Sequence, residues 1–112
     1  MRFDGFVIAT DNPQALGDWY CALLGATRQN TNSATLGQLQ MIFFPHDQVT
    51  GTSPQPERIM LNFAVDDAAA FTNHANNLDV TWVRPFEPEP FGLLATIADP
   101  DGNLVQFTQF RS

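Results

Sequence analysis

Few residues in this chain could take part in chemistry, and the most prominent of them is an amide. Gln106 lies at the centre of LVQFTQF (104–110), a short and mostly apolar segment that is typical of a β-strand. Side chains alternate between the two faces of a strand, so Leu104, Gln106 and Thr108 share one face. An amide both donates and accepts hydrogen bonds. Gln106 is therefore either a ligand contact or an amide that pairs with neighbouring backbone or water.

The other reactive side chains form no recognisable catalytic motif. The only histidines, His46 and His74, stand in different segments, and we expect both at the surface. Cys21 lies in a helical segment without an obvious nearby base, which favours an inert thiol. DPDG (99–102) has the start of a calcium loop but lacks the distal glutamate, so a hairpin turn is the better interpretation. The chain contains neither a glycine-rich phosphate loop nor a serine-nucleophile motif.

Composition and charge narrow the function classes. The chain has 112 residues, of which 44% are hydrophobic and 15% charged, as in one globular domain. Its formal net charge of −7 makes nucleic acid an unexpected partner, because a phosphate backbone needs clustered positive charge. The same charge favours a cationic small molecule over an anionic one. No apolar run could span a membrane and no signal segment is visible, so we expect a cytoplasmic protein without a membrane partner.

The elements that must position these residues occur twice along the chain. Residues 3–10 predict a strand and residues 11–25 a helix, and residues 58–80 again predict a strand followed by a helix. IATDNPQAL begins at Ile8 and FAVDDAAAF at Phe63, which is a shift of 63 − 8 = 55 residues. In this alignment the strand end, the helix cap and the first helical turn coincide, which indicates an internal duplication.

Each half continues with further strand-like segments, less clearly in the first half than in the second. We therefore predict an α+β fold in which one domain, residues 1–112, contains two βαβββ modules at about 1–45 and about 58–112. The segment at about 45–57 contains three prolines and is the expected linker. We expect each sheet to have one helix-covered face and one face of small and polar side chains. The second kind of face suits curled sheets around a cleft.

Candidate contacts with a ligand lie on strands and beside PFEPEP (85–90), which we interpret as a proline-rich loop with two glutamates. The opening strand of the second module places Met60 and Asn62 on its softer face. Aromatic residues around the loop could stack on a planar or cationic ligand, and packing in the core or in a dimer interface is the alternative. Arg84 could pair with a loop glutamate or face a ligand carboxylate. The complete candidate set is Gln40, Met60, Asn62, Trp82, Arg84, Phe86, Phe91 and Gln106.

Three segments together resemble the vicinal oxygen chelate superfamily, which includes glyoxalase I, bleomycin-resistance proteins and extradiol dioxygenases. They are NPQALGDWYCALLGA (12–26), LNFAVDDAAAF (61–71) and DPDGNLVQF (99–107). The resemblance covers nearly the whole chain. It implies paired βαβββ modules whose sheets curl around a shared cleft, and it implies a homodimer. Enzymes of this superfamily hold a divalent metal in the cleft through His, Gln or Glu, and the metal acts as a Lewis acid.

The residues that the resemblance places at the metal-ligand positions are poor donors. They are Gly5, Met60, Gln106 and, near the fourth position, Gln40. Glycine has no side chain, a thioether binds hard divalent ions poorly, and two neutral amides would hold Zn²⁺, Ni²⁺ or Fe²⁺ weakly. We therefore expect neither a metal nor another cofactor at these positions.

The resulting hypothesis is a metal-independent small-molecule binding protein of the glyoxalase/bleomycin-resistance type, which would sequester a cationic or aromatic compound. The alternative is a metal-dependent glyoxalase-like lyase, isomerase or dioxygenase with a displaced site. Its candidate residues are Gln40, His46, Glu87 and Gln106. In a third interpretation the domain only mediates protein association and has no ligand cavity.

Overall fold

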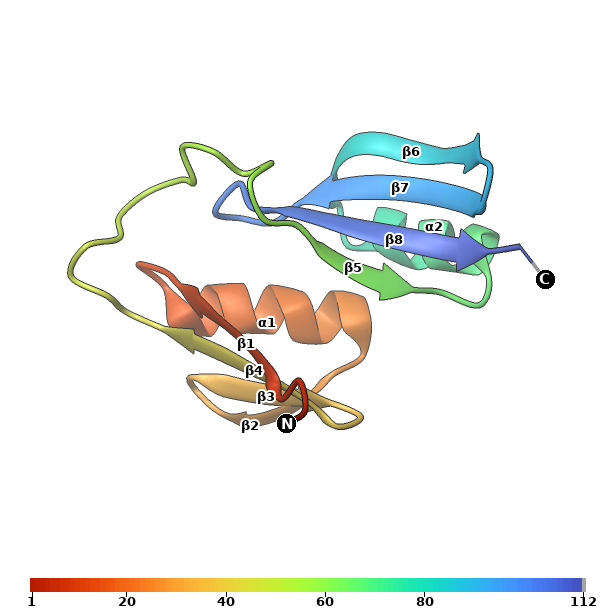
Figure 1. The fold of residues 1–112 in the computed structure, drawn as a ribbon. Coiled ribbons are helices and arrows are strands. Elements are labelled where there is room, and N and C mark those ends of the chain that lie inside the picture. Colours follow the sequence, from red (N-terminus) through yellow and green to blue (C-terminus); the bar gives the residue numbers. More distant parts are fainter. Residues whose placement is uncertain (112) are drawn as a thin grey trace. The chain divides into compact units, whose positions relative to one another are not determined.

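Two four-stranded sheets and two helices make up the fold in the computed structural model, which describes residues 1–111 (Figure 1). In chain order the elements are β1 Gly5–Ala9, α1 Pro13–Leu24, β2 Thr27–Asn30, β3 Ser33–Leu36, β4 Leu39–Phe44, β5 Leu61–Ala64, α2 Ala68–Asn77, β6 Thr81–Glu89, β7 Gly92–Ala98 and β8 Leu104–Phe110. The sheet orders are β1–β4–β3–β2 and β5–β8–β7–β6, and the curled sheets do not close. The predicted α+β class with two βαβββ modules is therefore confirmed.

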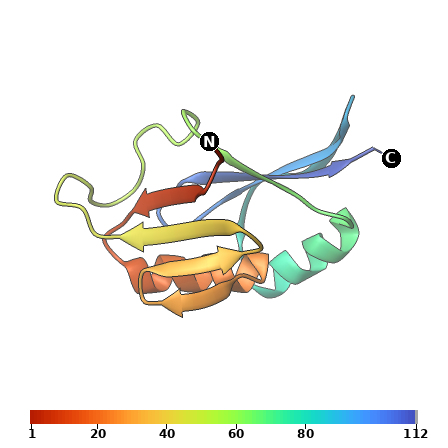
Figure 2. The ribbon, with the colours of Figure 1, turned by 60° about the horizontal axis from the view of Figure 1, so that its bottom comes forward.

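The chain divides into two units, each built on the same plan. The first comprises Met1–Gly51 with β1 to β4 and α1, and the second begins at Thr52 and holds β5 to β8 and α2. In each unit the first strand pairs in parallel with the last one, and the remaining neighbours pair antiparallel. Figure 2 shows the strands of the first sheet together, with α1 along one face. No helix within residues 1–111 is long and apolar enough to cross a membrane.

Local capping explains where α1 begins and ends. The side chain of Asn12 accepts a hydrogen bond from the backbone N–H of Ala15 at 3.1 Å, and Pro13 occupies the first turn. Gly25 ends the helix in the left-handed region, with φ of 72°, and its N–H donates to the carbonyl of Cys21. In the second unit, the side chain of Asp67 caps α2 in the same way.

Each helix covers one face of its own sheet with aromatic contacts. Tyr20 of α1 stacks on Phe43 of β4, with ring centroids 5.5 Å apart. Phe71 of α2 packs on Phe107 of β8 at 4.4 Å, and Phe107 also stacks on Phe63 of β5. The apolar side chains buried between each helix and its sheet include Leu16, Leu23, Met41, Ala75, Ile97 and Val105. The opposite face of each sheet carries no helix of its own unit.

The sequence interpretation was wrong for the segment PFEPEP, residues 85–90. It is not a loop, because β6 runs through Pro85 and Pro88 as far as Glu89. Proline removes a hydrogen-bond donor from a strand, but β6 is the edge strand of its sheet and can tolerate that loss on its open side. The strand β2 was not specifically expected either, because its sequence TRQN (27–30) is short, polar and largely exposed.

Candidate ligand-binding face

The uncovered face of the second sheet brings four polar side chains into one row. The strand registers pair Arg84 with Thr96, Thr96 with Gln106, and Gln106 with Asn62, so the row crosses β6, β7, β8 and β5. Directly paired residues point to the same face of a sheet. Because Phe107, the next residue after Gln106, packs against α2, the four side chains lie on the face opposite that helix. We call this set the polar row.

The amide of Gln106 is available for new hydrogen bonds. Its side chain is half-buried and makes no hydrogen bond with any residue in the range 1–111. Thr96 beside it is 6% exposed. In the next cross-strand row, Thr108 donates its hydroxyl to Oδ1 of Asn62 at 3.0 Å, which leaves the NH₂ group of Asn62 as a donor. The centre of the face therefore offers amide and hydroxyl groups without a formal charge.

Arg84 closes one end of the polar row and is held by two glutamates of its own strand. Its Nε donates to Glu87 and one terminal nitrogen donates to Glu89. The hydrogen bonds to Glu89 and Glu87 raise the pKa of the Arg84 guanidinium above its ordinary value. With all three groups ionised, the cluster carries 1 − 2 = −1 charge. Of the two roles that the sequence left open for Arg84, the structure shows pairing with the glutamates.

Two register shifts in β6 make this cluster possible. They fall between Trp82 and Arg84 and between Arg84 and Glu87. Strict alternation would place Glu87 and Glu89 on the face opposite Arg84. The shift after Arg84 turns the glutamates to its own face, since Glu87 pairs with Leu94, which lies two residues from Thr96.

The three candidate aromatic residues lie outside the polar row. Trp82 donates from Nε1 to Asn76 of α2 at 2.8 Å, and Phe86 makes an edge contact with Phe71 of the same helix. Both therefore lie on the helix-covered face. Phe91 occupies the turn between β6 and β7, where it is 45% exposed and contacts Phe110.

The remaining candidates lie at the start of β5 or in the first unit. Met60 precedes β5 and is 38% exposed. Gln40 lies on β4, exposed on the uncovered face of the first sheet, where it pairs with Gly5 and Thr35. His46 follows β4 at the surface, and its Nδ1 accepts a hydrogen bond from the backbone N–H of Gln48.

The residues at the expected metal positions do not fit a firmly held divalent ion. A Cβ atom on Gly5 would lie 1.9 Å from the carbonyl oxygen of Gln40, so no side chain fits there without a backbone movement. Met60 offers a thioether, and Gln106 offers a neutral amide. Within residues 1–111, no three His, Cys, Asp or Glu side chains form a group that could hold a metal ion.

Thr96 is the member of the polar row that the sequence did not single out. The turn at residues 99–103 places Ala98 opposite Leu104. Counting two residues back along β7 and two forward along β8 from this pair places Thr96 opposite Gln106. Asp99 organises this turn by accepting hydrogen bonds from the backbone N–H groups of Asp101 and Asn103. Counting outward from the turn DPDGN would have found Thr96, once the loop length was known.

Comparison with known proteins gives a family and a set of related folds. Residues 5–108 match the family model described as a glyoxalase-like domain. No curated protein sequence matches the chain significantly. TnmS3, an antibiotic binding protein from Streptomyces sp. CB03234, is 15% identical with a TM-score of 0.77, over 99% of this chain and 97% of its own.

Two further solved structures have the same fold. A glyoxalase/bleomycin resistance protein/dioxygenase family enzyme from Burkholderia phytofirmans PsJN is 16% identical, with a TM-score of 0.79 over 99% of this chain and 100% of its own. A glyoxalase family protein from Enterococcus faecalis is 21% identical, with a TM-score of 0.77 over 96% of this chain and 97% of its own. At these identities the likeness concerns the fold.

Proposed function

The chain belongs to the glyoxalase-like domain family, which confirms the resemblance to the vicinal oxygen chelate superfamily, and from this premise we propose that it is a metal-independent small-molecule binding protein. The observation that carries the proposal is the polar row, in which Asn62 and Gln106 present amide groups on the sheet face opposite α2, with the nearly buried hydroxyl of Thr96 beside them. These groups suit recognition by hydrogen bonding and are poor ligands for a metal ion.

The surroundings of the polar row support binding of an organic molecule. On one side the adjoining cross-strand row contains Leu104 and Ala98, and on the other side it contains Leu94, Ala64 and, between them, the buried Thr108, whose hydroxyl is engaged by Asn62. A small number of polar groups between apolar walls is the usual composition of a small-molecule site. The apolar atoms would contact the body of the ligand, while Gln106 and Thr96 would fix its orientation.

The charge at the end of the polar row favours a cationic or neutral ligand. Arg84 is engaged by Glu87 and Glu89, and the cluster of three carries a net charge of −1. A ligand carboxylate would have to displace a glutamate from Arg84. A ligand amine or protonated ring nitrogen would leave these bonds intact and would interact with the carboxylate oxygens that Arg84 does not use.

The first ligand class to test is antibiotics and related aromatic natural products. TnmS3, which has this fold, is described as an antibiotic binding protein. We infer sequestration of such a compound by this chain, and we infer a homodimer as its assembly. The alternative function, metal-dependent lyase, isomerase or dioxygenase chemistry, predicts a tightly held metal and is decided by the same experiment.

Native mass spectrometry of the protein purified without chelator tests this proposal. It reports subunit number, bound metal and any co-purified compound, before and after addition of Ni²⁺, Zn²⁺, Mn²⁺ or Fe²⁺. We expect a dimer that takes up no stoichiometric metal and that binds members of a panel of cationic and aromatic compounds. One tightly bound metal per subunit would contradict the proposal and would support the enzyme alternative.

A pair of variants connects binding to the polar row. Gln106→Leu removes the amide at nearly constant volume and should weaken binding of the panel compounds about tenfold or more, which corresponds to about 1.4 kcal/mol. Gln48→Leu changes an exposed glutamine of the first unit and should leave binding unchanged. Equal affinities in the two variants would exclude Gln106 as a ligand contact.

A further inference from the structure

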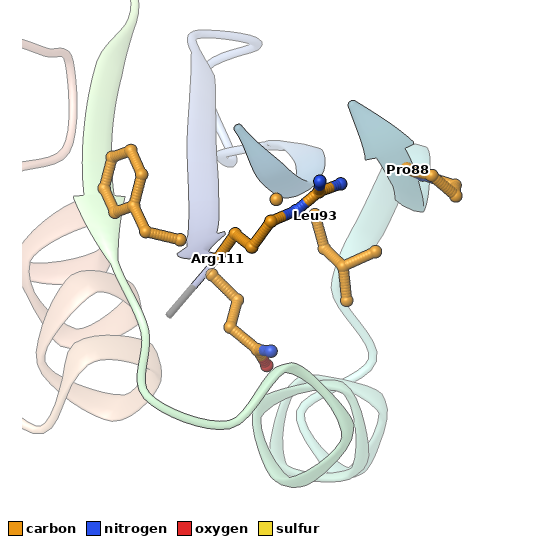
Figure 3. Close-up of a pocket in the computed structure, with 6 residues that line it drawn as sticks. Pro88, Leu93 and Arg111 are labelled. Atoms are coloured by element: carbon orange, nitrogen blue, oxygen red, sulfur yellow. The ribbon is translucent and has the colours of Figure 1, made fainter. Parts of the chain in front are cut away.

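A pocket lies in the second unit, at the end of its sheet where β6 turns into β7 (Figure 3). Its volume is about 250 Å³. The lining residues are Pro88, Gly92, Leu93, Gln109, Phe110 and Arg111. None of them belongs to the polar row, so the pocket is a separate candidate site.

Strand register places the pocket on the sheet face opposite the polar row. Pro88 pairs with Leu93 and Leu93 pairs with Gln109, which forms a cross-strand row over β6, β7 and β8. Gln109 belongs to the face that α2 covers, because its Oε1 accepts a hydrogen bond from the backbone N–H of Ala68, the first residue of that helix, at 2.6 Å. This bond fixes the amide and leaves its Nε2 as a donor.

Gly92 shapes the base of the pocket by allowing β8 to come close. Its φ is 147°, a backbone conformation that residues with a side chain rarely adopt. A Cβ atom at this position would lie 2.1 Å from the carbonyl oxygen of Gln109. The backbone N–H of Arg111 also donates to the carbonyl of Phe91 at 2.9 Å, which fixes the point where the Arg111 side chain leaves the backbone.

Arg111 provides positive charge that no group within residues 1–111 pairs with. Among the five arginines of the chain, it is the one whose guanidinium has no hydrogen bond or ion pair with residues 1–111. The other four bind carboxylates or amide oxygens; they are Arg2, Arg28, Arg58 and Arg84. Figure 3 shows the Arg111 side chain extending from the end of β8 toward Leu93 and Pro88. The charge thus stands beside apolar side chains instead of beside a carboxylate.

We propose that this pocket binds a small carboxylate with an apolar body, of about the size of benzoate. The guanidinium of Arg111 would hold the carboxylate through two parallel hydrogen bonds, and Nε2 of Gln109 provides a further donor. Leu93 and Pro88 provide the apolar wall. The net charge of −7 does not prevent this, because salt screens exposed charges beyond about 8 Å at physiological ionic strength.

Nuclear magnetic resonance titration of the ¹⁵N-labelled full chain tests the site with two probes of equal shape. Sodium benzoate should shift the backbone amide signals of Gly92, Gln109 and Arg111 together with the Nε–H signal of Arg111. Benzamide, the neutral analogue, should leave these signals in place, as should sodium chloride at the same ionic strength. Equal shifts with benzamide, or shifts by benzoate at Asn62 and Gln106 instead, would overturn the proposal.

Variants separate the charge from the apolar wall. Arg111→Gln should weaken benzoate binding at least about tenfold, because hydrogen bonds to a charged group contribute roughly 1.5–3 kcal/mol. Arg2→Gln alters an exposed arginine of the first unit and should leave benzoate binding unchanged. Sodium acetate should bind more weakly than benzoate, since it lacks the apolar body. Unchanged benzoate affinity in Arg111→Gln, or acetate binding as tightly as benzoate, would contradict the assignment.

Discussion

The hydroxyl of Thr108 donates a hydrogen bond to Oδ1 of Asn62 at 3.0 Å and joins β8 to β5 on the uncovered face of the second sheet. Thr108 is 1% exposed, whereas Asn62 is exposed. A buried group therefore fixes the orientation of an accessible amide. The NH₂ group of Asn62 is left to face a ligand beside Gln106, its partner in the strand register.

Thr108→Val tests this arrangement, because valine keeps the shape of the side chain and removes the hydroxyl. We expect the free energy of unfolding to fall by about 1 kcal/mol, the usual net contribution of one hydrogen bond. Ligand binding should also weaken, since Asn62 loses the bond that orients it. Urea unfolding and ligand titration measure the two effects. Thr108→Ser, which keeps the hydroxyl, should bind as the wild type does, and wild-type affinity in Thr108→Val would show that the bond is not needed.

The double variant Glu87→Gln, Glu89→Gln tests the charge preference of the polar row. It removes both carboxylates from Arg84 and changes the net charge of the cluster from −1 to +1. We expect cationic members of the compound panel to bind more weakly and carboxylate-bearing members to bind more tightly, while neutral members change little. Isothermal titration calorimetry measures the three classes. Parallel changes in all three would indicate a structural effect and not an electrostatic one.

The pairing of Arg84 with two glutamates predicts how the free energy of unfolding depends on pH. The hydrogen bonds that Arg84 donates to Glu89 and Glu87 raise its pKa above the ordinary value of an arginine. Because the pKa of Arg84 is higher in the folded protein than in the unfolded one, its ion pairs stabilise the fold fully at every pH below the unfolded-state pKa. This contribution is lost only as the pH rises through the folded-state pKa. Titration of Arg84 should therefore not change the difference in unfolding free energy between the wild type and Arg84→Gln between about pH 6 and pH 9. Urea unfolding of both proteins across this range measures it.

The sequence predicted the elements whose signals are local. The helix predicted over residues 11–25 agrees with α1 at Pro13–Leu24, because capping chemistry depends on the nearest few residues. Strand alternation grouped Gln106 with Leu104 and Thr108 and grouped Asn62 with Met60, but only the strand register shows that Gln106 and Asn62 are paired on one face of the sheet. The fold and part of the polar row were thus accessible before the structure.

The features that the sequence could not supply depend on interactions between distant residues. The prolines of PFEPEP indicated a loop, but the position of β6 at the sheet edge allows the strand to continue through them. The register shifts on either side of Arg84 place it on the face opposite Trp82 and on the same face as Glu87, whereas alternation alone predicts the reverse for both pairs. That Arg111 has no side-chain partner in the described part of the chain, unlike the other arginines, could not be known before the structure.

A close contact between Gly17 and Arg28 predicts a coupled effect on stability. A Cβ atom on Gly17 would lie 1.7 Å from a terminal nitrogen of Arg28, whose other terminal nitrogen donates to the carbonyl of Gln14 at 3.0 Å. Gly17→Ala should therefore displace the guanidinium and destabilise the wild type. In the Arg28→Ala background the same change should stabilise the protein by about 0.5–1 kcal/mol, the ordinary gain for alanine in a helix. Urea unfolding of the four proteins gives the coupling, and equal effects in both backgrounds would contradict it.

The pair Met60→His, Gln106→Glu tests the transfer of the family's metal positions to this chain. Leu61 pairs with Val105, so position 60 continues β5 opposite Leu104, two residues from Gln106 on the same face. An imidazole and a carboxylate at these diagonal positions provide donors that a divalent ion prefers.

We expect this double variant to bind Ni²⁺ or Zn²⁺ measurably more tightly than the wild type in isothermal titration calorimetry. Met60→His with Gln106→Leu is the control, because it adds the imidazole without a carboxylate, and it should gain less affinity. Gly5→His should not add a third ligand, since any side chain at position 5 meets the carbonyl of Gln40, and it should lower the thermal midpoint instead. No gain in the double variant would show that Met60 and Gln106 do not occupy the family's ligand positions.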